Sequence, residues 1–245
     1  MYATAPEDHD SLVIVPTYNE VQNLECLVQA VLDQDTTTRF TLLIIDDNSP
    51  DGTGELADLL AAERPERLAV LHRARKLGLG TAYIAGFRYA LQHGYTHVFE
   101  MDADFSHDPS TLPLLRSALE DADLVVGSRY VRGGSARGWS IPRRALSQLG
   151  SFYAGSILGV PVRDLTGGFK GYRANVLANI NLGAIKSSGY AFQIEMTYYA
   201  FAHGFRIMEL PICFGPRAAG NSKMGFSIVL EALLAVWRLR LTAHP

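Results

Sequence analysis

The amino-acid sequence predicts a single α/β domain, in which helices flank a mostly parallel central sheet and a C-terminal amphipathic helical elaboration follows. Short, continuous apolar runs, typical of strands buried on both faces, alternate with segments whose apolar residues recur at helical spacing. The links between them are short, as in parallel sheets built from strand–helix–strand units. A length of 245 residues, with 48% hydrophobic and 19% charged residues, provides enough chain for a sizeable core.

Apolar runs predict the strands of the first half. The first run covers residues 11–15 and is expected to stop at Pro16. The other expected strands are residues 41–45, 68–71, 97–101 and 123–126, the helices between them are 20–32, 54–62 and 80–92, and a further helix is expected to start at 108–110. Ligands of such sheets bind beyond the carboxyl ends of the strands, so the turns after these strands form the candidate site.

The pattern changes after residue 126. Residues 127–140 are rich in glycine and arginine, which predicts a long loop, and long loops in compact domains are usually functional or mobile. The expected elements beyond it are helices over 142–158, 190–203 and 226–241, a strand or turn over 166–173, a strand over 206–214 and a polar loop over 216–225.

Charge and cysteine content exclude several functional classes. The net charge of −3 gives no indication of nucleic-acid binding. Residues 124–162 contain no acidic residue but five arginines, which predicts either a solvated basic face or a surface that binds an anion. Cys26 and Cys213 match no metal or redox spacing, so we expect structural thiols in a reducing compartment. We find neither a signal peptide nor a run of roughly 18–20 apolar residues, and we expect a soluble or peripheral protein.

Three polar turns follow expected strands, at residues 16–20, 46–49 and 102–104. In the last of them, Asp102 and Asp104 place two carboxylates one residue apart, where they can reach a divalent cation and the oxygens of a phosphorylated ligand together. Alone, such a pair also occurs in many surface turns. Three carboxylate-bearing turns on one edge of a sheet favour a site. The glycine fingerprint of dinucleotide folds and the phosphate loop of nucleoside triphosphatases are both absent from the sequence.

Seven segments, read in order, resemble the GT-A glycosyltransferases of family 2, and more narrowly the catalytic chains of polyprenol- and dolichol-phosphate mannose synthases. The segments are PTYNE (16–20), IDDNSPDGT (45–53), KLGLGTAY (76–83), MDADFSH (101–107), GSRY (127–130), DLTGGF (164–169) and GYAFQIEM (189–196). Each segment is weak alone, but their order and spacing are specific. The resemblance covers the chain from Leu12 to about Leu241 and implies a Rossmann-like GT-A fold.

The resemblance implies an inverting transfer of mannose from GDP-mannose to a polyprenyl (dolichyl-type) monophosphate, with Mg²⁺ or Mn²⁺ at the donor diphosphate. We expect a flexible N-terminus over residues 1–10 and one domain over 11–245, with a nucleotide-sugar half (11–127) and an acceptor half that includes the C-terminal helix (128–245). The implied nucleotide-sugar contacts are Pro16, Tyr18, Glu20, Ile45, Asp47, Asp102, Ala103, Asp104, Arg217 and Lys223.

By the same resemblance, Asp102, Asp104 and Ser106 hold the metal, although some relatives have glutamine in place of Ser106, so direct ligation there stays open. The implied catalytic residues are Asp104, Arg129 and Arg143, of which the two arginines bind the acceptor phosphate. Guanidinium groups suit this role because they bind phosphate oxygens bidentately. A phosphate monoester has a second pKa of about 6 and is mostly a dianion at neutral pH, so no catalytic base is required.

Three further residues have structural interpretations. We expect His107 to cap a helix or pack in the core, although it lies close enough to the acidic turn to be a ligand. Glu195 lies on an otherwise apolar helix, and the structural interpretation pairs it with an arginine such as Arg173 or Arg206. Asp164 is expected to tie the turn at residues 166–168.

A lipid acceptor requires a surface that faces a membrane, and segments 142–158 and 226–241 are the amphipathic candidates. We expect peripheral association with the cytoplasmic face of a membrane, with or without a membrane-anchored partner subunit. Two alternatives stay open: the same chemistry with UDP-glucose as donor, and a non-catalytic subunit that binds a nucleotide sugar. Such a subunit is expected to have lost one of the metal or phosphate contacts, and the sequence retains them all.

Overall fold

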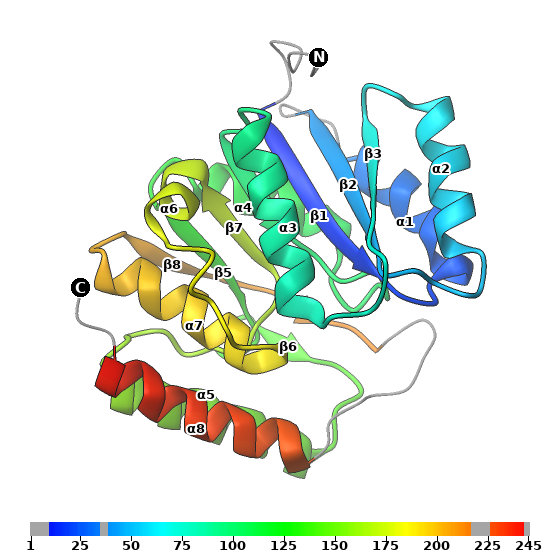
Figure 1. The fold of residues 1–245 in the computed structure, drawn as a ribbon. Helices are drawn as coiled ribbons and strands as arrows, with labels where there is room; N and C mark the ends of the chain where they lie inside the picture. The colour runs from blue at the N-terminus through cyan, green and yellow to red at the C-terminus, as the bar shows by residue number, and fades with distance from the viewer. Residues whose placement is uncertain (1–9, 35–38, 217–225, 243–245) are drawn as a thin grey trace.

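The computed structural model describes residues 10–34, 39–216 and 226–242, and a seven-stranded sheet forms its centre (Figure 1). The strand order is β3-β2-β1-β4-β7-β5-β8. The strands are β1 (Ser11–Thr17), β2 (Phe40–Asp46), β3 (Leu68–His72), β4 (His97–Glu100), β5 (Leu124–Ser128), β7 (Lys170–Arg173) and β8 (Ile207–Pro211). Strand β7 is antiparallel to its neighbours β4 and β5, and the other pairings of this sheet are parallel. The prediction of a mostly parallel sheet is confirmed.

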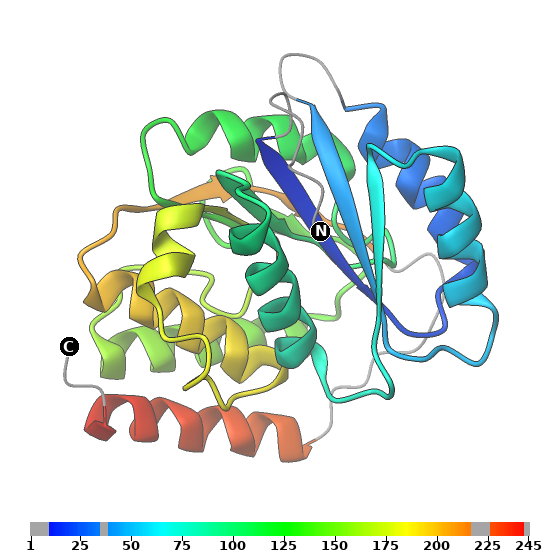
Figure 2. The same cartoon turned by 45° about the horizontal axis from the view of Figure 1, so that its top comes forward.

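Helices cover both faces of the sheet, as Figures 1 and 2 show. They are α1 (Val21–Leu32), α2 (Thr53–Glu63), α3 (Leu79–Gln92), the 3-10 turn η1 (Pro109–Thr111), α4 (Leu112–Ala118), α5 (Ile141–Leu158), α6 (Ala174–Asn179), α7 (Gly189–Ala202) and α8 (Phe226–Thr242). Two short strands, β6 (Ser135–Ala136) and β9 (Cys213–Phe214), pair in parallel outside the main sheet. Helix α8 packs against α5 and α7.

Side-chain alternation along the strands creates two separate cores. In β1, Val13 and Val15 join the cluster formed with α1, α2 and α4, whereas Leu12 and Ile14 join the cluster formed with α3 and α7. Successive side chains of a strand point to opposite faces, so a continuous apolar run serves both clusters. The continuous runs that predicted buried strands therefore have a direct physical cause.

Several boundaries differ from the sequence predictions. Strand β1 does not stop at Pro16 but continues to Thr17. Its pairing with β4 ends at Ile14, so at Pro16 strand β1 pairs only with β2. The strand can therefore accommodate a proline there, although proline has no backbone N–H to donate. The expected strand over residues 206–214 is divided between β8 and β9, and the short helix α6 was not predicted. The expected flexible N-terminus lies outside the described residues except for Asp10, as does the polar loop except for Pro216.

Glycine at position 86 allows α3 to approach β1 closely, and we predict that Gly86→Ala destabilises the fold. A Cβ atom there would lie 2.6 Å from Ile14 Cγ2, which belongs to a stiff β-branched side chain in the core. Overpacking of this kind costs about 1–3 kcal/mol. Urea unfolding followed by circular dichroism measures the change. The matched control is Gly150→Ala in α5, where a Cβ would have nothing within 4 Å, and it is expected to leave stability unchanged or raise it. Equal midpoints for both variants would contradict the packing explanation.

Helix α8 is fixed to the domain by apolar and polar contacts. Ala235, Val236 and Leu239 are buried, and Arg238 donates a 2.7 Å hydrogen bond to Ser187 Oγ. Arg238 also lies 3.7 Å from Glu195 of α7. The prediction that Glu195 pairs with an arginine is therefore confirmed, but the arginine is Arg238 and not Arg173 or Arg206. Arg173 instead donates to the backbone carbonyls of residues 119, 120 and 122, and Arg206 pairs with Asp123.

Among the described residues, no helix is long and apolar enough to cross a lipid bilayer.

Candidate active site

The three polar turns meet at one edge of the sheet, at the carboxyl ends of β1, β2 and β4. The chain leaves β1 toward β2 and β3 on one side, and β4 then pairs with β1 on the other side. In open α/β sheets, ligands bind at such a switch point. Backbone hydrogen bonds from Asp47 N to Thr17 O and from Met101 N to Ile14 O connect the three strand ends.

The turns after β1 and β2 are bound to each other by backbone-to-side-chain hydrogen bonds. Asn19 N donates to Ser49 Oγ at 3.1 Å, and Glu20 N donates to Thr53 Oγ1 at 3.0 Å. Asn19 and Asn48 both adopt positive φ, a conformation that asparagine tolerates better than other non-glycine residues. These turns therefore form one rigid unit that contains Tyr18.

A basic loop between β3 and α3 lies over this unit. The Nζ atom of Lys76 lies 3.8 Å from the centre of the Tyr18 ring, and Arg73 Nε lies 3.0 Å from Asp47 Oδ1. Burial raises the pKa of Asp47, although the charges of Arg73 and Lys76 oppose this change. Arg73 Nη1 is buried without a hydrogen-bond partner among the described residues, which leaves a donor for a ligand or water. The sequence interpretation gave Arg73 and Lys76 no role.

The carboxylates of Asp102 and Asp104 lie in a tight turn directly after β4. The Asp102 side chain is 33% exposed, whereas Asp104 is only 7% exposed. Asp104 Oδ1 accepts a 3.0 Å hydrogen bond from Ser106 N, and Phe105 between them has a φ of 60°. Ser106 Oγ is buried and has no hydrogen-bond partner among the described residues.

These donors fit a magnesium or manganese ion. Such ions take oxygen ligands and are commonly held by one or two carboxylates, the remaining positions being filled by water and substrate phosphates. Asp102 and Asp104 supply the carboxylates, and the unpartnered Ser106 hydroxyl lies in the same turn. No cluster of three or more His, Cys, Asp or Glu side chains that could hold a metal ion occurs in the described ranges. The site therefore fits a metal that shares its ligands with a diphosphate.

His107 stabilises this turn from inside the core. It is buried and stacks on Phe169 with the ring centroids 4.8 Å apart, and its Nδ1 accepts a hydrogen bond from Asp102 N at 3.1 Å. Burial lowers its pKa, although the charges of Asp102 and Asp104 oppose this change. The neutral imidazole is the form that accepts at Nδ1. The expectation of core packing for His107 is confirmed.

Tyr83 of α3 orients the Asp102 carboxylate, and sequence reasoning assigned it no function. Its hydroxyl donates to Asp102 Oδ1 at 3.4 Å, and its ring stacks on Phe192 of α7. Burial, with the negative charge of Asp102, raises the pKa of Tyr83 well above its usual value, so the hydroxyl stays protonated. A tyrosine in the apolar stripe of a helix gives no sequence signal for this role.

We predict that Tyr83→Phe weakens the binding of Mn²⁺ in the presence of a nucleoside diphosphate by about fivefold, because one hydrogen bond to a charged ligand is lost. Titration calorimetry measures the affinity. Tyr89→Phe on the same helix is the matched control, since the Tyr89 ring stacks on His93 instead. An unchanged affinity in Tyr83→Phe would show that this hydroxyl does not orient the carboxylate.

A buried polar network underlies the turn. Glu100, two residues before Asp102, accepts hydrogen bonds from Tyr172 and from Gln193 Nε2, the latter at 2.6 Å. Lys170 donates to the Gln193 carbonyl oxygen at 2.8 Å. Burial raises the pKa of Glu100 and lowers that of Lys170, while the charge of each partner opposes the change. The network connects β4, β7 and α7 below the carboxylates.

Arg129, directly after β5, is almost completely buried and bound by Asp164. Its Nε and Nη2 donate to the two Asp164 oxygens at 2.7 and 2.6 Å, and its backbone N–H donates to Asp164 Oδ2. Nη2 also donates to Thr166 Oγ1 at 2.9 Å. Burial opposes the charge of Arg129, but the hydrogen bond and charge of Asp164 outweigh it and raise its pKa. Gly167 N donates to the Asp164 carbonyl oxygen, so the tie between Asp164 and this turn is confirmed.

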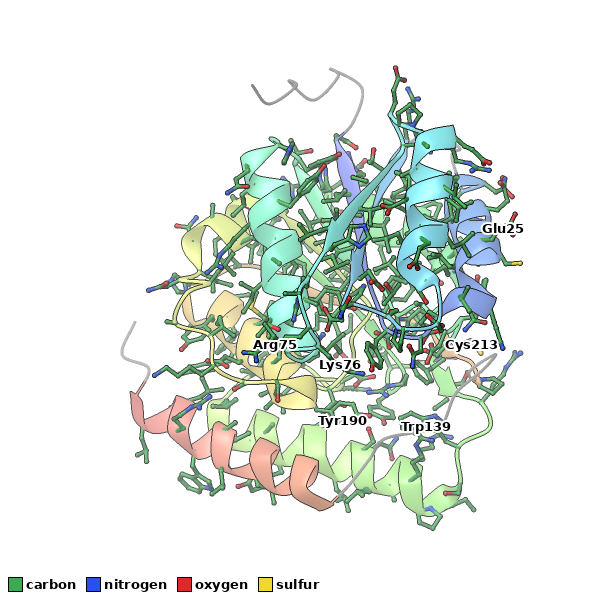
Figure 3. All side chains as sticks on the ribbon, turned by 45° about the vertical axis from the view of Figure 1, so that its right-hand side comes forward. Glu25, Arg75, Lys76, Trp139, Tyr190 and Cys213 are labelled. Atoms are coloured by element: carbon green, nitrogen blue, oxygen red, sulfur yellow. The ribbon has the colours of Figure 1, made fainter. Side chains whose placement is uncertain are left out.

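Trp139 brings the two predicted acceptor arginines together. The guanidinium carbon of Arg129 lies 5.1 Å from its ring centre, and that of Arg143 lies 4.2 Å from it. Arg143 Nε is buried without a hydrogen-bond partner among the described residues. In Figure 3, Trp139 and Tyr190 lie between helix α5 and the upper part of the molecule, with Lys76 above them.

The remaining predicted residues divide into two groups. Pro16, Glu20, Ile45 and Ala103 lie at the ends of β1, β2 and β4, where the predicted nucleotide-sugar contacts gather. Arg217 and Lys223, the predicted contacts to the donor phosphates, lie outside the described residues.

Comparisons with known proteins show the family to which the chain belongs. Residues 12–180 match the family described as Glycosyl transferase family 2. The chain is 46% identical over 241 residues to a polyprenol monophosphomannose synthase of Mycolicibacterium smegmatis, covering 97% of this chain and 90% of that protein. It is 47% identical over 233 residues to an undecaprenyl-phosphate mannosyltransferase of Micrococcus luteus, covering 95% of each.

Solved structures agree on the fold. The glucosyl-3-phosphoglycerate synthase of Mycobacterium tuberculosis, in complex with Mn²⁺, UDP and glucosyl-3-phosphoglycerate, has a TM-score of 0.67 at 19% identity, covering 96% of this chain and 81% of that chain. A mannosyltransferase from Pyrobaculum calidifontis, in complex with GDP-Man and Mn²⁺, has a TM-score of 0.58 at 18% identity, covering 94% and 60%. With its family match over most of its length, the chain belongs to glycosyl transferase family 2 and has the GT-A fold.

Proposed function

We propose that the protein transfers mannose from GDP-mannose to a polyprenyl monophosphate, with inversion at the anomeric carbon and with Mg²⁺ or Mn²⁺ as cofactor. The observation that carries the proposal is the identity of 46–47% over nearly the whole chain to two enzymes named for mannosyl transfer to a polyprenyl phosphate. The acidic turn and the pair of arginines on Trp139 provide the chemistry that such a transfer requires.

On the donor side, Asp102 and Asp104 would hold the metal, while Tyr83 and His107 keep Asp102 in position. The bound ion would neutralise the negative charge that develops on the departing diphosphate. The turn that carries Tyr18 would hold the nucleotide, together with Asp47. By family resemblance, two cationic residues outside the described ranges, Arg217 and Lys223, meet the donor phosphates.

On the acceptor side, Arg129 and Arg143 would both bind the lipid phosphate but would contribute in different ways. Asp164 neutralises Arg129 and occupies its Nε–Nη2 edge, so Arg129 offers a fixed donor at Nη1 with little net charge. Arg143 would supply most of the electrostatic attraction. An oxygen of the phosphate dianion forms the new bond to the anomeric carbon of mannose while the bond to the GDP oxygen breaks, and GDP leaves. Since the nucleophile is already ionised, the step needs no general base.

Transfer of radiolabel tests this proposal. The protein is incubated with Mg²⁺ or Mn²⁺, a short polyprenyl phosphate and labelled GDP-mannose or UDP-glucose, and the lipid is then extracted. We expect label in the lipid from GDP-mannose only when a metal is present. Label from UDP-glucose alone would overturn the donor assignment, and absence of label from both donors would favour a non-catalytic subunit.

A membrane surface is the second part of the proposal. Helices α5 and α8 lie side by side and expose the large apolar side chains of Leu149, Phe152, Leu234, Trp237 and Leu241. An amphipathic helix with such a face can lie in the interface of a bilayer. These helices would bring the lipid phosphate to Arg143 at the start of α5.

We predict that Leu234→Asp reduces co-flotation of the protein with anionic liposomes by at least about tenfold, because a charge in an apolar contact is costly. Leu59→Asp in α2 is the matched control, since Leu234 is 64% exposed and Leu59 is 66% exposed. Equal flotation of the two variants would argue against α8 as the contact. A wild-type protein that does not float would instead favour anchoring by a partner subunit.

A further inference from the structure

A groove of about 670 Å³ runs along one side of α5, and the proposed function does not use it. Helix α5 forms one wall with Ser151, Gly155 and Ser156, the segment 159–163 forms the other, and Tyr130 lies at its border. The volume is typical of sites that bind small molecules. We propose that this groove binds the first isoprene units of the acceptor lipid, an inference that rests on the proposed function.

The groove is continuous with the proposed phosphate site. Tyr130 follows Arg129 in the chain. On the helix wall, Ser151 Oγ lies 3.5 Å from Thr166 Oγ1, and Thr166 Oγ1 accepts a hydrogen bond from Arg129 Nη2. The helix wall is therefore connected to the guanidinium group of Arg129 through Thr166. A lipid whose phosphate lies at Arg129 can place the adjoining part of its tail in the groove.

The lining suits a branched apolar chain. Among the described residues it contains no carboxylate, and Val160, Pro161 and Val162 make the wall formed by segment 159–163 apolar. Glycine and serine on the helix wall leave room for methyl branches. Of the lining residues that the structure describes, Arg163 alone is charged, which suits an anionic lipid better than a cationic one.

Close packing defines the shape of the groove. A Cβ atom at Gly155 would lie 3.1 Å from the carbonyl oxygen of Val160, so helix and segment 159–163 already approach as closely as glycine allows. Gly159, with a φ of 72°, ends α5 in the left-handed conformation and turns the chain back along the helix. Both walls are thus held by the backbone.

Helical geometry places the groove residues of α5 on one side of that helix. Positions 148, 151, 152, 155 and 156 share one helix face because they are spaced by three, four, seven and eight residues. Tyr153 and Ile157, which pack against the cluster that contains Val236 and Leu239 of α8, point to the other side. Phe152 lines the groove and is also among the apolar residues of the proposed membrane surface. A tail longer than the groove can therefore continue past Phe152 into the bilayer.

Ser156→Trp tests the proposal by filling the groove at an exposed position, where the folding cost is small. We expect KM for undecaprenyl phosphate to rise about tenfold, because burial of roughly two methylene groups of the tail is lost. The KM for GDP-mannose is expected to stay unchanged. The matched control is Leu146→Trp, an exposed position of α5 on the other side of the helix. An equal KM for undecaprenyl phosphate in both variants would overturn the proposal.

Photo-cross-linking tests the groove independently of transfer. A prenyl phosphate with a diazirine in its second isoprene unit is expected to label residues 148–163 in the wild type and Leu146→Trp, but not in Ser156→Trp. Label confined to α8, or removed by an excess of ordinary phospholipid, would overturn the proposal. Specific labelling of the groove in a protein that transfers no mannose would show that the proposed function fails while the lipid site remains.

Discussion

Asp104→Asn is expected to reduce kcat/KM for metal-dependent mannosyl transfer by at least about 10²–10³, the size of effect seen when one stabilising group is removed from a developing oxyanion. The asparagine oxygen can still accept the hydrogen bond that Asp104 Oδ1 accepts from Ser106 N, so the turn is expected to persist. The substitution removes one of the two negative charges proposed to hold the cation. Steady-state kinetics over a range of Mn²⁺ concentrations measures the loss, and raising the metal is expected to restore only part of it.

Asp108→Asn is the control, because Asp108 Oδ1 accepts a hydrogen bond from Ser110 N in the same i to i+2 pattern four residues along the chain. Both variants remove one carboxylate and retain one such turn. Only the Asp104 variant is expected to lose activity, with thermal unfolding unchanged in both. Full activity of Asp104→Asn would show that Asp104 does not bind the metal.

Asp164→Ala is expected to lower the free energy of unfolding by about 3–5 kcal/mol, because it leaves the charge of Arg129 buried without its partner. Arg129 is only 4% exposed, and Asp164 accepts three hydrogen bonds from it. Such a loss is a large part of the total stability of a typical domain. Urea unfolding monitored by tryptophan fluorescence and circular dichroism measures it.

Glu66→Ala provides the comparison, since Glu66 pairs with Arg39 on the surface at 3.7 Å, and its loss is expected to cost less than about 1 kcal/mol. A double variant separates stability from function. Arg129→Met with Asp164→Asn removes the buried charges and retains an oxygen for the backbone N–H of residue 129. We expect it to recover most of the stability without recovering use of the lipid phosphate. Recovery of transfer would mean that Arg129 does not bind the acceptor.

The α/β class and most elements of residues 11–127 follow from sequence, because each strand there is a continuous apolar run whose two faces both enter a core. The position of Asp102 at the end of β4 follows in the same way. The contacts around Asp102 cannot be predicted from the sequence. Nothing in the local pattern distinguishes Tyr83 from an ordinary core tyrosine, and its contact with Asp102 depends on how α3 packs across the sheet.

Long-range register explains the rest of what sequence reasoning missed. Lys170 lies opposite Glu100 only because β7 enters between β4 and β5 in the antiparallel direction, and this insertion has no periodic signature. The partner of Glu195 was wrong for a similar reason. Its arginine comes from α8, so it depends on the docking of a helix that follows more than twenty residues after α7.

The direction of β7 also affects where the proposed donor and acceptor sites lie on the sheet. An antiparallel strand begins at the edge where its parallel neighbours end, so residues 164–169 enter the sheet beside the turns that leave β4 and β5. The turns proposed to bind the donor follow β1, β2 and β4, whereas the segments around Arg129 and Asp164 flank β5 and β7. Under the proposed function, donor and acceptor are therefore bound by different loops of the same sheet. We expect that exchanging residues 129–140 and 159–169 between relatives changes the choice of acceptor, while β1, β2 and β4 keep their register.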